Sequence, residues 1–219
     1  MIKAFFLIFE PSEAWDRIAR ARRSFAYILG VYLLPLILLV TAAEGWGLAS
    51  WGKWQPRFQK FRDFTDDTAV STLGKYQNII TFEVIQAALL LAMVLLSALL
   101  LLKISQTFQN RRKYLEAFTT MAYAYSPLLV VRLMDAGPMV SPWTTWAIGI
   151  LLTVWVLYQG IPRVMQPDPT HAFGLYLSAM FVVILTSGMA RLLTALYLLG
   201  EVDFHHSWLT HKFPGLFQP

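Results

Sequence analysis

The sequence predicts an all-α fold, a polytopic transmembrane helical bundle of five spans with short interfacial amphipathic helices. Of the 219 residues, 57% are hydrophobic and 14% are charged, whereas soluble domains average about 25% charged residues. The apolar residues gather in blocks of about 18 or more, which is the length a helix needs to cross a bilayer. We therefore expect one membrane domain over residues 1–219, with lipid as its solvent.

Five apolar blocks are expected to cross the bilayer. The first carries no charge, and Pro35 near its middle is expected to kink the helix because proline lacks a backbone N–H. The third is more polar and should face protein rather than lipid. The last is long enough that it must tilt, bend near Gly188 or project beyond the bilayer. The predicted spans are residues 25–43, 79–102, 117–134, 143–161 and 172–199.

Two stretches outside these spans have the pattern of helices that lie among lipid headgroups. In the first, which Ser12 is expected to cap, Trp15, Ile18 and Ala19 share one face and charged residues take the other. The second lies in the loop between spans one and two, where aromatic and basic residues are interleaved. Its aromatic residues are Trp46, Trp51, Trp54, Phe58, Phe61 and Phe64.

The distribution of basic residues predicts the orientation. With the amino terminus inside, the short cytoplasmic segments would hold ten lysines and arginines, and the opposite side would hold six. The amino-terminal stretch lacks the apolar core and cleavage site of a secretory signal, so we expect it to be retained. The sequence thus predicts a cytoplasmic amino terminus and an external carboxyl terminus.

Short motifs along the chain resemble a known family. The stretch Ile8–Ile18 (IFEPSEAWDRI) precedes a basic turn and the first span. Further on, Tyr114–Phe118 (YLEAF) leads into Ala122–Pro127 (AYAYSP) in the third span. The fourth span carries Trp155, Tyr158, Gly160 and Ile161, and Ala172 opens the fifth. In order and spacing these motifs resemble the bacterial branch of the Yip family of membrane proteins.

The resemblance implies a five-helix fold with a cytoplasmic amino terminus, in a family whose members mostly act as membrane adaptors. Eukaryotic members are associated with small GTPases, but this chain lacks their long cytosolic segment before span one. Some bacterial members are associated with ABC-type export systems. The resemblance therefore suggests a prokaryotic inner (cytoplasmic) membrane and ABC-type transporter subunits as partners.

Two arginines at the third and fifth spans are the strongest candidates for a site. An unpaired charge in the bilayer is costly, so Arg132 and Arg191 need acidic partners. In the predicted topology Glu83, Asp135 and Glu201 lie at the same outer level. The cluster either orients helices as a structural group of ion pairs or forms part of a proton or ion pathway; the lack of a second acidic layer favours the structural role.

Other polar residues have two interpretations each. Tyr123, Ser126 and Pro127 either pack at a helix kink or line a cavity. The basic cluster Arg111, Arg112 and Lys113 is expected to contact anionic lipid or to dock a cytosolic protein.

Several classes of function are disfavoured. The chain has no cysteine, which excludes thiol catalysis and Cys-ligated metals. Phosphate-loop, nucleophile-elbow and dinucleotide-binding motifs are absent, so we expect no enzyme and no cofactor. The tail histidines lack metal-ligand spacing. The net charge of +5 lies at the ends of apolar blocks, which indicates lipid headgroups rather than nucleic acid.

The sequence therefore favours a non-catalytic adaptor that binds the lipid bilayer and other integral membrane proteins, and it is compatible with a homo-oligomer. The alternative is a small transporter or channel that uses the polar third span and the outer cluster of arginines and acids. Convergence of Tyr123, Ser126, Arg132 and Arg191 on a continuous cavity would favour transport, and dry packing would favour the adaptor.

Overall fold

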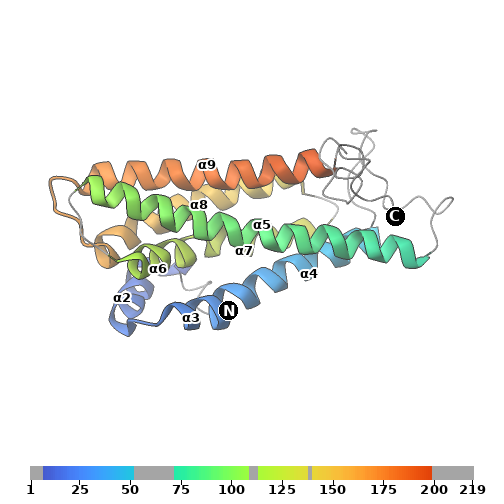
Figure 1. Ribbon diagram of the computed structural model, residues 1–219, viewed down its shortest axis with the longest axis horizontal. Coiled ribbons are helices and arrows are strands. Elements are labelled where there is room, and N and C mark those ends of the chain that lie inside the picture. The colour runs from blue at the N-terminus through green and yellow to red at the C-terminus, as the bar shows by residue number, and fades with distance from the viewer. Residues whose placement is uncertain (1–6, 52–71, 109–112, 138–139, 199–219) are drawn as a thin grey trace, which may run out of the picture.

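The computed structural model describes residues 7–51, 72–108, 113–137 and 140–198, and over these residues the chain is helical with no strand (Figure 1). The helices, in chain order, are α2 (Pro11–Ala21), α3 (Phe25–Tyr27), the π-helix η1 (Ile28–Leu33), α4 (Leu34–Trp51), α5 (Thr72–Thr107), α6 (Tyr114–Ala124), α7 (Ser126–Arg132), the 3₁₀-helix η2 (Leu133–Ala136), α8 (Pro142–Val164) and α9 (Ala172–Leu198).

Four helical stretches in the described part of the chain are long and apolar enough to cross a bilayer. They are Phe25–Ser50, Ile79–Thr107, Pro142–Val164 and Ala172–Tyr197, and they correspond to the first, second, fourth and fifth predicted spans. The first and second predicted spans are shorter than the helices that contain them, because α4 continues to Trp51 and α5 begins at Thr72. At Gly188, where a bend was one of the alternatives considered, α9 is not interrupted.

The third predicted span, residues 117–134, is not a single long helix. The chain forms α6, is interrupted at Tyr125, and continues as α7 and η2. The cause is Pro127, which has no N–H for the carbonyl of Tyr123 four residues earlier and whose ring crowds that carbonyl. The count of five spans is therefore not confirmed by helix length.

The predicted kink at Pro35 takes the form of a π-helix. Pro35 is the second residue of α4, directly after η1. At the end of η1 the N–H of Leu34 bonds to the carbonyl of Leu29, five residues back, so the turn widens where proline cannot donate.

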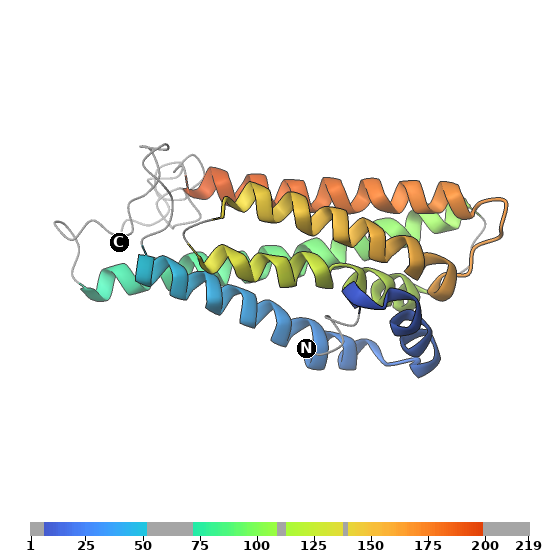
Figure 2. The ribbon, with the colours of Figure 1, turned by 180° about the vertical axis from the view of Figure 1, so that it is seen from behind.

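The helices pack lengthwise around the interrupted helix α6–α7. Helix α5 packs against α4, α6 and α9, and α8 packs against α6, α7 and α9 (Figures 1 and 2). Twelve of the thirteen residues 117–129 are buried, and the remaining one, Thr119, is half-buried. The most polar predicted span is thus the centre of the bundle, as its composition indicated.

Helix α2 lies at one end of the bundle and packs on α8 (Figure 2). It begins at Pro11 with Glu10 as N-cap, so the predicted cap at Ser12 is wrong. The predicted apolar face exists, but Trp15 and Ile18 are buried against protein. Of the second predicted interfacial helix, Trp46 and Trp51 belong to α4, and Trp54, Phe58, Phe61 and Phe64 lie outside the described residues.

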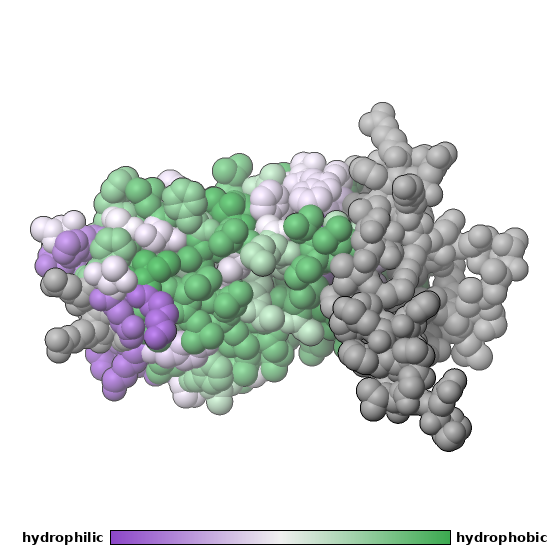
Figure 3. Space-filling view, turned by 45° about the horizontal axis from the view of Figure 1, so that its top comes forward, coloured by the Kyte–Doolittle hydropathy of each residue, from purple (hydrophilic) through white to green (hydrophobic). Residues whose placement is uncertain are grey.

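The outer surface of the bundle is apolar along its middle. Figure 3 shows a hydrophobic band there and hydrophilic residues at the end where α5 finishes and α6 begins. Large apolar side chains on the long helices are exposed, among them Val84, Leu96, Leu151, Phe181 and Leu185. A surface of this kind indicates contact with lipid or with other membrane proteins.

Candidate functional site

Polar side chains from every long helix meet near the end of the bundle opposite α2. We call this group the ion-pair layer, and it consists of Glu44 on α4, Gln86 on α5, Arg132 on α7, Asp135 on η2, Thr145 on α8, and Arg191 and Thr194 on α9. The layer forms because α7 ends at Arg132 and η2 turns Asp135 back toward it, three residues later.

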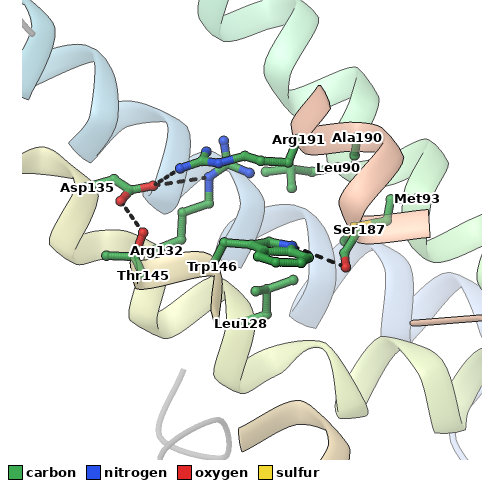
Figure 4. Close-up of a pocket in the computed structure, with 10 residues that line it drawn as sticks. All are labelled: Leu90, Met93, Leu128, Arg132, Asp135, Thr145, Trp146, Ser187, Ala190 and Arg191. Carbon is green, nitrogen blue, oxygen red and sulfur yellow. Dashed lines mark hydrogen bonds and ion pairs between the residues drawn. The ribbon is translucent and has the colours of Figure 1, made fainter. Parts of the chain in front are cut away.

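Asp135 is the acceptor at the centre of this layer. Its carboxylate is fully buried and lies 3.2 Å from Nη2 of Arg191 and 3.9 Å from Nε of Arg132 (Figure 4). Thr145 donates a hydrogen bond to its other oxygen. A buried carboxylate is tolerable only with such partners, because desolvation of an isolated charge is costly. Arg132 and Arg191 thus share Asp135, which the sequence predicted to lie at the same depth in the membrane.

Glu44 holds the other side of Arg132. Its Oε2 accepts from Nη2 of Arg132 at 3.2 Å and from Nε at 3.3 Å. Gln86 donates to the same oxygen at 3.3 Å, and Thr194 donates to Oε1 of Gln86 at 2.8 Å. Since Thr194 lies one turn beyond Arg191 on α9, the contacts form a closed ring through α4, α5, α7, η2 and α9. Two arginines and two carboxylates alternate within it.

Sequence reasoning missed Glu44 and Gln86. The predicted first span ended at residue 43, one residue before Glu44, although the helix continues to Trp51. The available signal was an acid inside an uncharged stretch, with Gly45 and Gly47 after it. For Gln86 the available signal was weaker, a single amide side chain within an apolar run.

Glycine lets α4 approach this layer closely. A Cβ on Gly47 would lie 2.4 Å from the carbonyl oxygen of Ala136, so only hydrogen fits between α4 and η2. At Gly45 a Cβ would lie 3.1 Å from Cγ of Glu83, whose carboxylate oxygens are shielded from solvent. The structure therefore places Glu83 of α5 against Gly45 of α4, the residue after Glu44. Glu201 lies outside the described residues.

A small cavity adjoins the ion-pair layer. Its volume is about 20 Å³, and its wall includes Arg132, Asp135, Trp146, Ser187 and Arg191 (Figure 4). Tyr123, Ser126 and Pro127 are not among the residues that line it. The four residues whose convergence would indicate transport thus divide between two places.

The second polar group lies at the interruption between α6 and α7. The hydroxyls of Ser97, Tyr125 and Thr186 are each 2.8 Å apart, which joins α5 and α9 to the interruption. Ser126 hydrogen-bonds to the hydroxyl of Tyr32 from η1. All of these side chains are buried, so at this depth the polar atoms are satisfied by one another.

Tyr123 packs within an aromatic cluster. Its ring centroid is 4.3 Å from that of Tyr32 and 6.4 Å from that of Trp15, which it meets edge-on. Together with Pro127 at the interruption, this arrangement corresponds to packing at a kink, one of the two interpretations of these residues.

Trp15 fixes α2 to the bundle. Its indole N–H donates to the carbonyl of Val156 at 2.9 Å, and the ring occupies the space above Gly160, where a Cβ would lie 2.5 Å from two ring atoms. At the edge of this contact, Asp16 pairs with Arg163 at 2.9 Å. We call these four residues and Val156 the α2 clamp. The prediction from sequence placed Trp15 in the headgroups and missed the clamp.

Of the predicted basic cluster, only Lys113 lies within the described residues; Arg111 and Arg112 lie outside them. Lys113 is exposed and is the N-cap of α6, and its backbone N–H donates to the Glu116 carboxylate at 2.8 Å. The acid thereby satisfies a helix-terminal donor. Among the residues that the structure describes, no three His, Asp or Glu side chains are grouped as metal ligands; the tail histidines lie outside them.

Comparison with known proteins gives one finding. A sequence profile of the Yip1 domain matches residues 5–190. The match includes α2, the interruption at Tyr125 and most of the ion-pair layer, and it ends one residue before Arg191. Neither the curated proteins nor the solved structures gave a match to this chain.

Proposed function

The chain belongs to the Yip1 domain family, and from that membership we propose that it is a non-catalytic membrane adaptor, an accessory subunit that binds other integral membrane proteins. The partner class that we propose is an ABC-type export assembly. The membership places the chain in a membrane protein family, and the adaptor role and its partners are our inference.

One observation carries the proposal. The ionisable side chains of the ion-pair layer contact one another, as Arg191 with Asp135 and Arg132 with Glu44. A transport site needs polar groups that face a continuous passage, whereas these charged side chains pair with one another across the helices. The adjoining cavity, at about 20 Å³, has room for about one water molecule. This arrangement stabilises a rigid body, which is what an adaptor requires.

We also propose a topology of five spans, with α6, α7 and η2 together as the third. These elements run from Tyr114 to Ala136 and would reach roughly 34 Å if helical throughout, about the thickness of a hydrocarbon core. One end of the bundle carries the basic residues of α2 together with Lys113 and Arg163. This distribution supports a cytoplasmic amino terminus, and the membrane that we propose is a prokaryotic inner membrane.

The surface proposed for partners lies on α8. Leu151, Trp155 and Tyr158 follow one another at helical spacing and are 71%, 56% and 58% exposed. Tyr158 is in edge contact with Tyr176 of α9, which holds the aromatic group in one orientation. Rigid aromatic side chains contribute much of the contact energy at protein interfaces.

The test is purification of the tagged protein at its natural level in mild detergent, with mass spectrometry of what is recovered in stoichiometric amounts. A set of transporter or other membrane subunits is the expected result. The triple variant L151A/W155A/Y158A should lose that set, whereas alanine at Ile80 and Val84, exposed on α5, should keep it. Recovery of the protein alone, or only as a homo-oligomer, would oppose the adaptor.

The alternative is a small transporter or channel, and the cavity beside Arg191 is the observation that favours it. Reconstituted liposomes distinguish the two. If the purified chain alone carries an ion flux across these liposomes, transport replaces the adaptor as the function. Impermeable liposomes agree with the proposal.

A further inference from the structure

Three arginines gather where α2 meets the first membrane helix, and we call Arg20, Arg22 and Arg23 the arginine turn. Arg20 lies in the last turn of α2, and Arg22 and Arg23 lie between α2 and α3 (Figure 1). Arg20 and Arg22 are exposed and Arg23 is half-buried. The first stretch able to cross a bilayer begins at Phe25, two residues after Arg23. The arginine turn therefore lies at the depth of the lipid headgroups, where a spanning helix leaves the hydrocarbon core.

The acids next to the arginine turn are paired with other cations. Glu13 pairs with Arg17 at 3.4 Å, and Asp16 pairs with Arg163 at 2.9 Å. Nε of Arg20 donates instead to the backbone carbonyl of Asp16 at 3.2 Å. Within the residues that the structure describes, no carboxylate pairs with a member of the arginine turn. The positive charge is thus not balanced by the neighbouring side chains, which favours an anion from outside the chain.

The backbone of the arginine turn is held in one conformation. Arg22 ends α2 in the left-handed region with φ 37°, which residues other than glycine seldom adopt. Ser24 then caps α3, and its Oγ accepts from the backbone N–H of Tyr27 at 3.4 Å. Phe25 packs on Phe118 of α6 with ring centroids 4.5 Å apart. Because these contacts fix the chain after the turn, an anion that binds there orders few additional groups.

Exposed aromatic rings beside the arginine turn favour a lipid over a soluble anion. The guanidinium carbon of Arg23 lies 4.3 Å from the ring centre of Tyr27, which is 39% exposed, and Phe25 is 37% exposed. Aromatic rings at the end of a span lie among headgroups, and a guanidinium binds phosphate oxygens in pairs. We propose that the arginine turn binds the phosphate of an anionic phospholipid, with Phe25 and Tyr27 beside the glycerol and upper acyl chains of that lipid.

The test is native mass spectrometry of the full chain, titrated with phosphatidylglycerol or with phosphatidylcholine of the same acyl chains. Phosphatidylglycerol should bind severalfold more tightly, because its headgroup carries a net negative charge. In the variant R22Q/R23Q the two lipids should bind with nearly equal affinity. In R22K/R23K part of the preference should remain, since lysine keeps the charge but lacks the paired donors of a guanidinium.

A matched control separates this site from net charge. R17Q/K103Q also removes two positive charges, from the paired Arg17 and from Lys103, which is exposed on α5, and it should keep the preference. Equal losses in the two glutamine variants would overturn the proposal, as would equal affinity for both lipids in the unaltered protein. Displacement of the lipid by glycerol 3-phosphate at equal concentration would also overturn it, because the site would then bind a soluble phosphate. If R22Q/R23Q fails to fold, Arg20→Gln replaces it: a smaller loss of preference is expected, and an unchanged preference would overturn the proposal.

Discussion

The indole N–H of Trp15 donates to the carbonyl oxygen of Val156 at 2.9 Å, across 141 residues of chain. The contact joins the amino-terminal helix α2 to α8, and it needs Gly160 one turn later to leave room for the ring. Because Trp15 is also in edge contact with Tyr123 of α6, one side chain links three helices. The stability of this end of the bundle should depend on it.

Gly160→Val should detach α2. The added Cβ would lie 2.5 Å from the ring of Trp15, and overpacking of this kind costs about 1–3 kcal/mol. Tryptic cleavage after Arg17 and Arg20 should become severalfold faster, and the apparent unfolding temperature in detergent should fall. Gly30→Ala is the matched control, since nothing lies within 4 Å of its added Cβ. Unchanged cleavage in Gly160→Val would show that α2 does not depend on the clamp.

Asp135→Asn should destabilise the protein strongly. It leaves Arg191 with an uncompensated buried charge, a change that costs about 3–5 kcal/mol. Reversible unfolding in mixed micelles measures the loss, and the double variant D135L/R191L should recover much of it because both charges are then absent. The control is Asp16→Asn, whose pair with Arg163 is exposed and worth at most about 1 kcal/mol. Equal losses for the two single variants would contradict the buried pairing.

Gly47→Ala should separate α4 from η2. Its Cβ would meet the carbonyl oxygen of Ala136 at 2.4 Å, and a backbone atom cannot move aside as a flexible side chain can. We expect a loss of about 1–3 kcal/mol in unfolding free energy. In Gly188→Ala, where the nearest atom is 3.8 Å away, stability should be unchanged or higher, because alanine favours helices. If both variants behave alike, the close approach does not matter.

Tyr125→Phe should weaken the contact of the interruption between α6 and α7 with helices α5 and α9. It removes the hydroxyl that bonds to Ser97 and Thr186, each at 2.8 Å, while the ring still fills its place. The expected loss is about 0.5–1.5 kcal/mol, since Ser97 and Thr186 keep their bond to each other. Tyr158→Phe is the control: because Tyr158 is 58% exposed, this variant should lose little unfolding free energy. The measurement is the unfolding free energy of the three proteins in the same micelles.

Local signals predicted much of the fold. Long apolar runs located the four long helices, because lipid requires such runs wherever a helix crosses. Polarity marked the region of α6 and α7 as interior, and Pro127 marked its irregularity. The pairing of Asp135 with both arginines could be expected because Arg132 and Asp135 are three residues apart and buried charges require partners.

Contacts between distant residues could not be predicted in the same way. Trp15 has the pattern of an interfacial residue, and only the space above Gly160 makes it a buried one. Glu44 was overlooked because the apolar pattern alone does not show where a helix ends, and its partner Arg132 is 88 residues away. Periodicity assigns a face to a residue and leaves open which helix covers that face.

The burial of α6 and α7 at the centre of the bundle bears on how the chain enters its membrane. Under the proposed topology this segment leaves the ribosome after α4 and α5 but before α8 and α9, so Glu44 and Gln86 are at hand for Arg132 while Arg191 is still to be made. Arg132 lies four residues before the end of this segment, and a charge that enters the bilayer without its partners is costly. We therefore expect the segment to wait beside the insertion machinery until the last two helices arrive, so that integration is completed cooperatively and late.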